Sequence, residues 1–266
     1  MRVLLTGCHG FIGRNVNDAL MERDDVDSVI CIEKDYINHD GWKSTLVKVV
    51  QNCDVILHVG AISDTMLKDP NEMMNCNFEF SRVLFNLAEY YDKKVVYSSS
   101  AANKGEGGSV PSNLYGWSKY VTEKYGVAKV SKFYALRYFN VYGPGEQNKN
   151  GMASVAFQAH RMGKFELFPG NPKRDFVYIK DVVSATLHPI FNEVLSGVYE
   201  VGSGEARTFE DVLRLMGVKY KYRDHSEVPK GYQFYTKANK SSFMTGWEPI
   251  YSLEKGLKEY KEYLES

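Results

Sequence analysis

The chain has 266 residues, of which 44% are hydrophobic and 25% charged, so it is long enough for one large domain or for one domain with a smaller lobe. Its 33 basic and 33 acidic residues give a formal net charge of zero, so there is no electrostatic reason to expect nucleic acid or an anionic membrane as a partner. No apolar run approaches the ~18 residues of a membrane-spanning helix, and a strand that begins at Arg2 leaves no room for a signal peptide. We therefore expect a cytoplasmic protein.

The four cysteines, Cys8, Cys31, Cys53 and Cys76, show no metal-binding spacing. Cys8 and Cys31 fall in or beside apolar, strand-like runs, so we expect them to be buried free thiols. The histidines form no cluster, and His58, near the end of an apolar run, is expected to be structural or adjacent to a cofactor. The sequence thus predicts no metal site.

The first two thirds of the chain alternate short β-rich runs with helical periodicity, which is typical of βαβ units and a parallel sheet. The predicted strands are residues 2–6, 28–33, 54–59, 94–100 and 133–139. The predicted helices are residues 11–23, 42–51, 71–91 and 114–130. Beyond about residue 140 the pattern loosens into short strands, loops and short helices, the helices at residues 152–162, 181–192 and 209–215.

A glycine-rich turn, TGCHGFIG, follows the first predicted strand and opens the first predicted helix. Its glycines, Gly7, Gly10 and Gly13, are three residues apart, and Phe11 and Ile12 start the helix. Glycines at such a turn let backbone N–H groups approach a pyrophosphate, and the helix N-terminus contributes partial positive charge. The turn therefore predicts the binding of a dinucleotide cofactor.

These elements predict an α/β fold, a Rossmann-type doubly wound parallel sheet with a small C-terminal substrate-binding lobe. We expect residues 1–140 to form the dinucleotide-binding domain, with the chain returning to it near residues 176–205. Residues 141–266 are expected to form mainly the lobe.

Glu33 ends the second predicted strand about 20 residues past the last glycine, where an acid would hold the adenosine ribose hydroxyls. A carboxylate there favours NAD, because it repels the 2′-phosphate of NADP. The adjacent Lys34 could turn outward and accept that phosphate. NAD is slightly favoured as the cofactor, and NADP stays open.

A serine, a tyrosine and a lysine predict a catalytic group. The run SSS places Ser100 at the carboxyl end of a parallel strand, where ligands bind in such folds, and Tyr115 and Lys119 lie one helical turn apart. A phenol with a pKa near ~10 is a poor base at neutral pH, but a nearby ammonium and a positive nicotinamide ring can lower that pKa. The pair could then take a hydroxyl proton while hydride leaves the same carbon, with the serine steadying the oxygen.

Together, TGCHGFIG, SSS, YGWSK and RYFNVYGP resemble the extended short-chain dehydrogenase/reductase (NAD-dependent epimerase/dehydratase) family, whose members modify nucleotide-diphosphate sugars. MASVAF, KRDFVYIKDV, GSGEARTF and YQFYT are most similar to its ADP-L-glycero-D-manno-heptose 6-epimerase branch. The resemblance covers nearly the whole chain. It implies NAD(P)-dependent epimerisation of a nucleotide sugar through transient hydride transfer and a keto intermediate, in a homo-oligomer.

The resemblance also implies residue roles. Ser100 matches the active-site serine, Tyr115 and Lys119 match the catalytic pair, and Asn140 matches the asparagine beside the nicotinamide and the substrate. Lys149 matches a second acid/base. A second proton donor suits epimerisation, because the ketone must be reduced from its opposite face. The alternative for Lys149 is a solvated loop lysine.

Resemblance further implies that Arg174 helps to hold the substrate diphosphate, which agrees with the bidentate preference of guanidinium for phosphate. A fold-stabilising pair between Arg174 and Asp175 is the alternative. Phe168, and Tyr232 with Gln233, are expected to line the nucleotide pocket, and a packing role is their alternative.

The chain departs from the family in three places. Segment 34–53 is short, so the third strand that normally cradles adenine is hard to find, and Trp42 or Leu46 could cover the adenine instead. Segment 101–114 is shorter than in relatives, and Gly231 stands where the heptose epimerases carry an arginine. These departures affect the identity of the substrate more than the chemistry.

The same residues also bear on three alternative functions. A 4,6-dehydratase needs an acidic pair after its catalytic hydroxyl residue, and here Ala101 and Ala102 follow Ser100. A 4-epimerase or 4-reductase of nucleotide sugars uses the same serine, tyrosine and lysine and stays open. A non-catalytic NAD(P)-binding protein on the same fold generally lacks the tyrosine–lysine pair.

Overall fold

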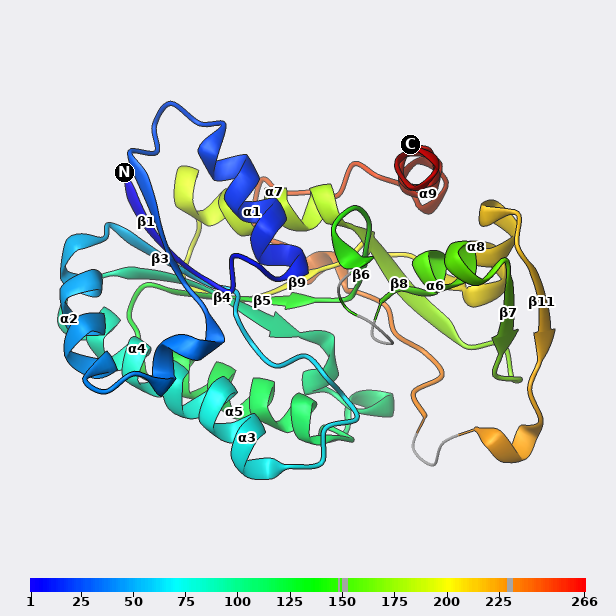
Figure 1. Cartoon of the computed structure of the whole chain (residues 1–266), viewed down its shortest axis with the longest axis horizontal. Helices are drawn as coiled ribbons and strands as arrows, with labels where there is room; N and C mark the ends of the chain where they lie inside the picture. Colours follow the sequence, from blue (N-terminus) through cyan, green and yellow to red (C-terminus); the bar gives the residue numbers. More distant parts are fainter. Residues whose placement is uncertain (148, 150–152, 229–231) are drawn as a thin grey trace.

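A six-stranded parallel sheet lies at the centre of the larger part of the molecule in the computed structural model, which describes residues 1–147, 149, 153–228 and 232–266 (Figure 1). The strand order is β2-β1-β3-β4-β5-β9, and all five neighbouring pairs are parallel. The strands are β1 (Arg2–Thr6), β2 (Ser28–Ile32), β3 (Val55–His58), β4 (Lys94–Ser100), β5 (Phe133–Tyr138) and β9 (Gly197–Val201). Their carboxyl ends therefore meet at one edge of the sheet.

Helices cover both faces of this sheet (Figure 1). One face is covered by α1 (Phe11–Met21) and α7 (Ile179–Phe191), and the other by α2 (Trp42–Asn52), α4 (Phe80–Tyr90) and α5 (Leu114–Lys129). Alternate residues of a strand serve opposite faces: Val3 and Leu5 of β1 join one buried cluster, and Leu4 joins the other. The predicted doubly wound α/β fold is confirmed.

Within the described part of the chain, no strand pairs with the outer edge of β2. Residues 33–54 contain only a 3-10 helix (Lys34–Asn38) and α2 as regular elements, so β2 is the edge strand. The sequence correctly indicated that this segment is too short for a third strand.

The predicted helix at residues 71–91 consists of three segments. A five-residue π-helix (Asn75–Glu79) joins α3 (Pro70–Met74) to α4. In its middle the buried Asn77 turns inward, and its side chain bonds to both backbone groups of Ile62 and to the hydroxyl of Ser118. Its carbonyl oxygen also accepts a bond from the hydroxyl of Thr122. The bond from Thr122 occupies a backbone oxygen that a regular helix pairs internally, at the point where the helical turn widens.

The C-terminal part contains two small sheets, whose bounds the sequence did not predict. The three-stranded sheet has the order β10-β8-β6, and β11 pairs with β7. The strands of these two sheets are β6 (Asn140–Tyr142), β7 (Lys164–Leu167), β8 (Lys173–Tyr178), β10 (Ala206–Thr208) and β11 (Lys219–Tyr222). The helices of this part are α6 (Val155–Met162), α8 (Phe209–Met216) and α9 (Leu253–Glu265). The division of the chain into domains at residue 140 stays a prediction.

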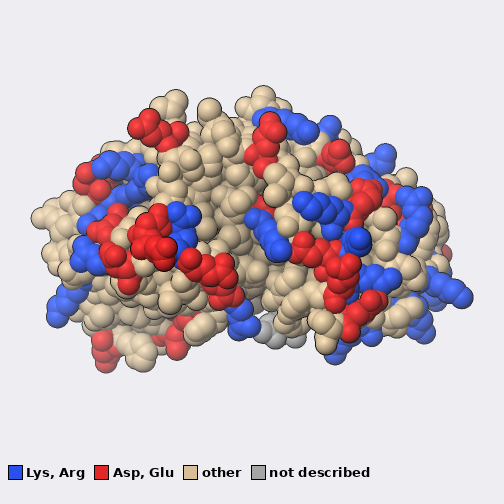
Figure 2. Space-filling view, turned by 90° about the horizontal axis from the view of Figure 1, so that it is seen from above, with Lys and Arg blue, Asp and Glu red and all other residues tan. Residues whose placement is uncertain are grey.

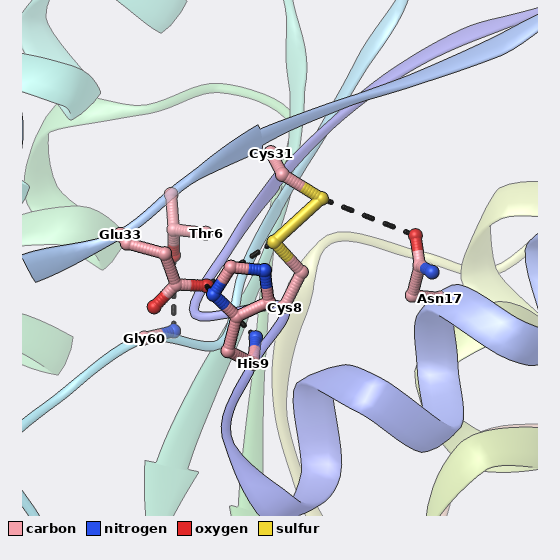
Figure 3. The surroundings of a disulfide bond; sticks show 7 residues. All are labelled: Thr6, Cys8, His9, Asn17, Cys31, Glu33 and Gly60. Atoms are coloured by element: carbon pink, nitrogen blue, oxygen red, sulfur yellow. Dashed lines mark hydrogen bonds and ion pairs between the residues drawn. A yellow bond between two sulfur atoms is a disulfide. The ribbon is translucent and has the colours of Figure 1, made fainter.

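The Cys8–Cys31 pair corrects one expectation. These two residues form a disulfide, with their Cα atoms 6.0 Å apart, so the prediction of free thiols is wrong for them (Figure 3). The reason is the register of the sheet: β1 and β2 are neighbours, and Cys31 pairs with Leu5, which brings Cys8, two residues past the end of β1, close to Cys31. Cys53 and Cys76 are free thiols, the first buried and the second partly buried.

Charge is mixed over the face shown in Figure 2. Lysine and arginine side chains alternate with aspartate and glutamate side chains at both ends of this face, and a largely uncharged strip lies between them. Among the described residues no helix is long and apolar enough to cross a membrane.

The buried carboxylate of Asp175 ties β8 to two other segments. It accepts hydrogen bonds from the backbone N–H groups of Ser203 (2.6 Å), Gly204 (2.9 Å) and Ala238 (3.0 Å), and from the hydroxyl of Ser203 (2.8 Å). Burial raises the pKa of this carboxyl group, and the four bonds oppose that rise. Asp175 is thus a structural anchor beside Arg174.

We predict that Asp175→Asn lowers the free energy of unfolding by roughly 1–3 kcal/mol, because the amide N–H₂ would face buried N–H donors. Urea denaturation measures this change. Asp24→Asn, at an exposed position, is the control and should leave stability unchanged. Equal stability of the two variants would contradict the anchoring role.

Candidate functional site

The glycine turn packs closely against its surroundings. Gly7 has φ +73°, and a Cβ there would collide with the backbone of Gly60, which follows β3. A Cβ on Gly13 would collide with the carbonyl oxygen of Gly7. Gly10 is the N-cap of α1 and has no side chain to cap the helix. The backbone N–H groups of the first helical turn, from Phe11 on, therefore have no side-chain hydrogen-bond acceptor at the N-cap. A turn of this kind fits a pyrophosphate at the helix N-terminus.

Glu33 lies against this turn, just after β2 (Figure 3). One of its carboxylate oxygens accepts a 2.8 Å hydrogen bond from the backbone N–H of His9 and lies 3.1 Å from the sulfur of Cys8. The neighbouring Lys34 forms a 2.7 Å ion pair with Glu72 of α3. The structure therefore places the predicted ribose-binding acid beside the glycines, and it directs the lysine towards another carboxylate.

The two residues suggested as a cover for adenine have different positions. Leu46 is fully buried in the core beneath the sheet, so it is not available to a ligand. Trp42 is half-buried, and its ring centroid lies 5.8 Å from that of Phe80.

Lys119 is buried against β4. It is 3% exposed, its ammonium donates a 2.7 Å hydrogen bond to the carbonyl oxygen of Ser98, and it lies 4.9 Å from the ring centroid of Tyr97. Burial lowers the pKa of Lys119 to about 7. Near neutral pH this amine can therefore both hold and release a proton.

Tyr115 lies near Ser100. Desolvation raises the pKa of the Tyr115 phenol, and a hydrogen bond with Ser100 opposes this rise. Ser100 is 9% exposed, and its hydroxyl also accepts a 3.1 Å bond from the backbone N–H of Ala102. Burial therefore acts on both members of the pair: it raises the pKa of the Tyr115 phenol and lowers that of the Lys119 amine.

Asn140 and Lys149 follow β5. Asn140 opens β6 and is exposed. Lys149 is half-buried, with its ammonium 5.2 Å from the ring centroid of Phe11 at the start of α1. Burial lowers the pKa of Lys149, and the carboxylate of Glu146 opposes this. The structure thus places Lys149 beside the glycine turn and not in a fully solvated loop.

Three predicted substrate-binding residues come together at the C-terminal part. The rings of Phe168 and Tyr232 meet edge to face with centroids 5.2 Å apart, and the guanidinium of Arg174 lies 5.3 Å from the Tyr232 ring. A second guanidinium, that of Arg223, lies 5.2 Å from the Phe168 ring. Sequence reasoning missed Arg223, because nothing in the spacing of the chain links it to Phe168.

The shortened segment after Ser100 bridges the two parts of the molecule. Lys104 forms a 3.3 Å ion pair with Glu200 of β9, and its carbonyl oxygen accepts a 3.5 Å bond from the side chain of Gln233. Gln233 therefore contacts this segment. Gly231 lies outside the described residues.

Comparison with known proteins agrees with this geometry. The sequence model described as "NAD dependent epimerase/dehydratase family" matches residues 3–202. An ADP-L-glycero-D-manno-heptose-6-epimerase of Brachyspira hyodysenteriae is 32% identical over 314 residues, which cover 99% of this chain and 98% of that protein. One of Cupriavidus pinatubonensis is 34% identical over 251 residues, covering 80% and 76%. The first alignment is longer than the 266 residues of this chain, so this relative contains segments that the chain lacks.

Solved structures show the same similarity. The ADP-L-glycero-D-manno-heptose-6-epimerase of Helicobacter pylori superposes with a TM-score of 0.87 at 27% identity, covering 100% of this chain and 96% of that one. The UDP-glucose 4-epimerase of Thermotoga maritima, solved with UDP-glucose, superposes with a TM-score of 0.81 at 26% identity, covering 100% and 99%. The chain belongs to the NAD-dependent epimerase/dehydratase family.

Proposed function

We propose that the protein epimerises a nucleotide-diphosphate sugar with a bound nicotinamide dinucleotide, as the ADP-heptose 6-epimerases that it resembles do. The observation that carries this proposal is the buried Lys119, bonded to Ser98 of β4, with Tyr115 one helical turn before it and near enough to Ser100 for that serine to oppose the rise of its pKa. These residues lie where β4 ends, at the same edge of the sheet as the glycine turn after β1.

The described residues fit such a cofactor. Gly7 and Gly13 carry no side chain, so a pyrophosphate could come close to the backbone of the turn. The first turn of α1 lacks a side-chain cap. Glu33 lies where the ribose hydroxyls would bind. When bound, the cofactor supplies the acceptor and donor of hydride. Glu33 would bind its ribose and the α1 N-terminus its diphosphate.

Proton transfer falls to Tyr115. As the substrate alcohol becomes a ketone, its C–H bond gives a hydride and its O–H bond gives a proton, which the phenolate oxygen of Tyr115 would accept. Ser100 would hold the substrate oxygen through its hydroxyl. Because burial raises the pKa of Tyr115, a protonated Lys119 beneath it is needed to stabilise the phenolate.

Lys149 would serve as the second acid/base. Its pKa is lowered by burial, so it can exchange a proton near neutral pH more readily than a solvated lysine. It lies on a different segment from Tyr115, beside Phe11. A proton donor separate from Tyr115 would let the keto intermediate be reduced from its opposite face.

The substrate would extend from these residues to the C-terminal part. Arg174 would bind the diphosphate, and the rings of Phe168 and Tyr232 would contact the nucleotide. A nucleotide-sugar 4-epimerase is the second candidate, because the UDP-glucose 4-epimerase of Thermotoga maritima shares the fold over the whole chain. An NMR screen of ADP-, GDP-, UDP- and dTDP-sugars for stereochemical change separates the two.

We predict that Tyr115→Phe lowers the turnover number about 10²- to 10⁴-fold, because the proton acceptor is lost. Cofactor affinity should change little, since the ring stays in place. Tyr120→Phe, on the same helix, is the matched control and should keep full activity. Normal turnover by Tyr115→Phe would refute the assignment.

Lys149→Ala is predicted to lose epimerisation while still oxidising the substrate in part, because Tyr115 and Ser100 remain. The measurement pairs NMR of the sugar with absorbance at the reduced-nicotinamide band in a single turnover. Exposed Lys164→Ala is the control. If Lys149→Ala epimerises at the normal rate, one acid/base residue suffices.

We further predict that NAD⁺ binds about tenfold more tightly than NADP⁺, a difference of about 1.4 kcal/mol. Glu33 would repel a 2′-phosphate, and Lys34 is held by Glu72. Glu72→Gln should release Lys34 and raise NADP⁺ affinity a few-fold with no effect on NAD⁺. Titration calorimetry measures both, with Glu79→Gln as control. Preference of the native protein for NADP⁺ would overturn this prediction.

A further inference from the structure

We propose that Glu123, paired with Arg137, is a positioning residue that holds Ser100 and Tyr115 in the geometry for proton transfer. This inference rests on the proposed function and goes beyond it, because neither residue belongs to the predicted site. Glu123 is 1% exposed, and the side chain of Arg137 is 16% exposed.

The first step is the placement of Glu123 on its helix. It follows Lys119 by four residues and Tyr115 by eight, so the three side chains share one face of α5. That face meets three consecutive serines of β4: Lys119 bonds to Ser98, Glu123 bonds to Ser99, and Tyr115 lies near Ser100, which opposes the rise of its pKa. Each serine of the run SSS thus lies against one side chain of α5.

The second step is the number of segments that this carboxylate joins. One of its oxygens accepts hydrogen bonds from the hydroxyl of Ser99 (2.6 Å), the side-chain amide of Asn103 (2.8 Å) and Nε of Arg137 (2.9 Å). The other oxygen accepts a 2.5 Å bond from Nη2 of Arg137. Asn103 also donates a 2.9 Å bond to the hydroxyl of Ser99.

These bonds enclose Ser100 on both sides. Ser99 precedes it directly, and Asn103 ends the 3-10 helix (Ala101–Asn103) that Ser100 caps. Both neighbours bond to Glu123, whose helix also carries Tyr115. The carboxylate therefore fixes the serine relative to the tyrosine. Arg137 adds β5 to the same network, three residues before Asn140.

Stability alone does not explain such a pair. Removing two charges from water costs several kcal/mol per ion, and well-packed apolar residues in their place are often as stable. Misplacement of a reacting group by about 1 Å can cost about 10²-fold in rate, so a rigid link between Ser100 and Tyr115 has a catalytic consequence. The two hydrogen bonds from Arg137 fix the orientation of the buried carboxylate.

Glu123→Gln and Ser99→Ala test the inference. We expect each to lower the turnover number about 10- to 100-fold, with KM and NAD⁺ affinity within about twofold of the native values. The tyrosine limb of the pH–rate profile should move to higher pH, because the bond from Ser100 that lowers the pKa of Tyr115 is weakened. Ser99→Ala leaves the Glu123–Arg137 pair in place, so it keeps the test valid if Glu123→Gln does not fold.

The direction of the shift separates the explanations. A purely electrostatic effect of Glu123→Gln would move the profile to lower pH, because a negative charge is removed, and a merely structural role would leave it unmoved. Either result would overturn the inference. Other ionisable groups near the network are Tyr97, Tyr120 and Glu200; the charge of Glu123 helps to raise the pKa of Tyr97, so Glu123→Gln lowers that pKa, whereas Ser99→Ala keeps this charge in place.

Asp181→Asn is the matched control. Asp181, on α7, is also a buried carboxylate. It accepts hydrogen bonds from the backbone N–H groups of Ile250 (3.0 Å) and Tyr251 (3.1 Å). It should lose stability without a shift of the pH profile. If the native protein turns over no nucleotide sugar, the proposed function fails. If the native protein is active and both site variants match it, only this inference fails.

Discussion

The burial of a polar run, SSS, against one face of α5 is the interaction on which the site depends. Ser98, Ser99 and Ser100 are each less than one tenth exposed, and an unpaired buried polar group costs roughly 1–3 kcal/mol. Helix α5 supplies a polar partner for each serine: the ammonium of Lys119 for Ser98, the carboxylate of Glu123 for Ser99 and the phenol of Tyr115 for Ser100. Packing and chemistry thus use the same contacts, and a change that loosens one loosens the other.

The same burial sets the protonation of the site. Desolvation lowers the pKa of Lys119 and raises that of Tyr115, so both groups move towards their neutral forms. Proton transfer from a substrate then depends on how firmly Ser100 supports the phenolate. This is why a carboxylate that contacts no ligand, Glu123, belongs to the account of the reaction.

Much of the fold and of the site was predictable, because its signals are local. Apolar runs gave β4 with its observed bounds, and glycine spacing located the turn. What escaped prediction depends on contacts between distant segments. The Cys8–Cys31 disulfide requires the register of β1 on β2, the π-helix requires Asn77 to reach Ile62, and the partners of Glu123 lie on β4 and β5.

The position of the shortened segments explains why the proposed chemistry can persist in a smaller chain. The missing strand would lie beyond β2, at the edge of the sheet, whereas the proposed catalytic residues come from β4 and from the helix packed on it. The absence of an edge strand leaves the order of the central strands β1-β3-β4-β5 unchanged. The shortened segment 101–114 lies next to Ser100, but Asn103 and Lys104 tie it to Glu123 and Glu200. Those two bonds attach the short segment to α5 and to β9 directly after Ser100.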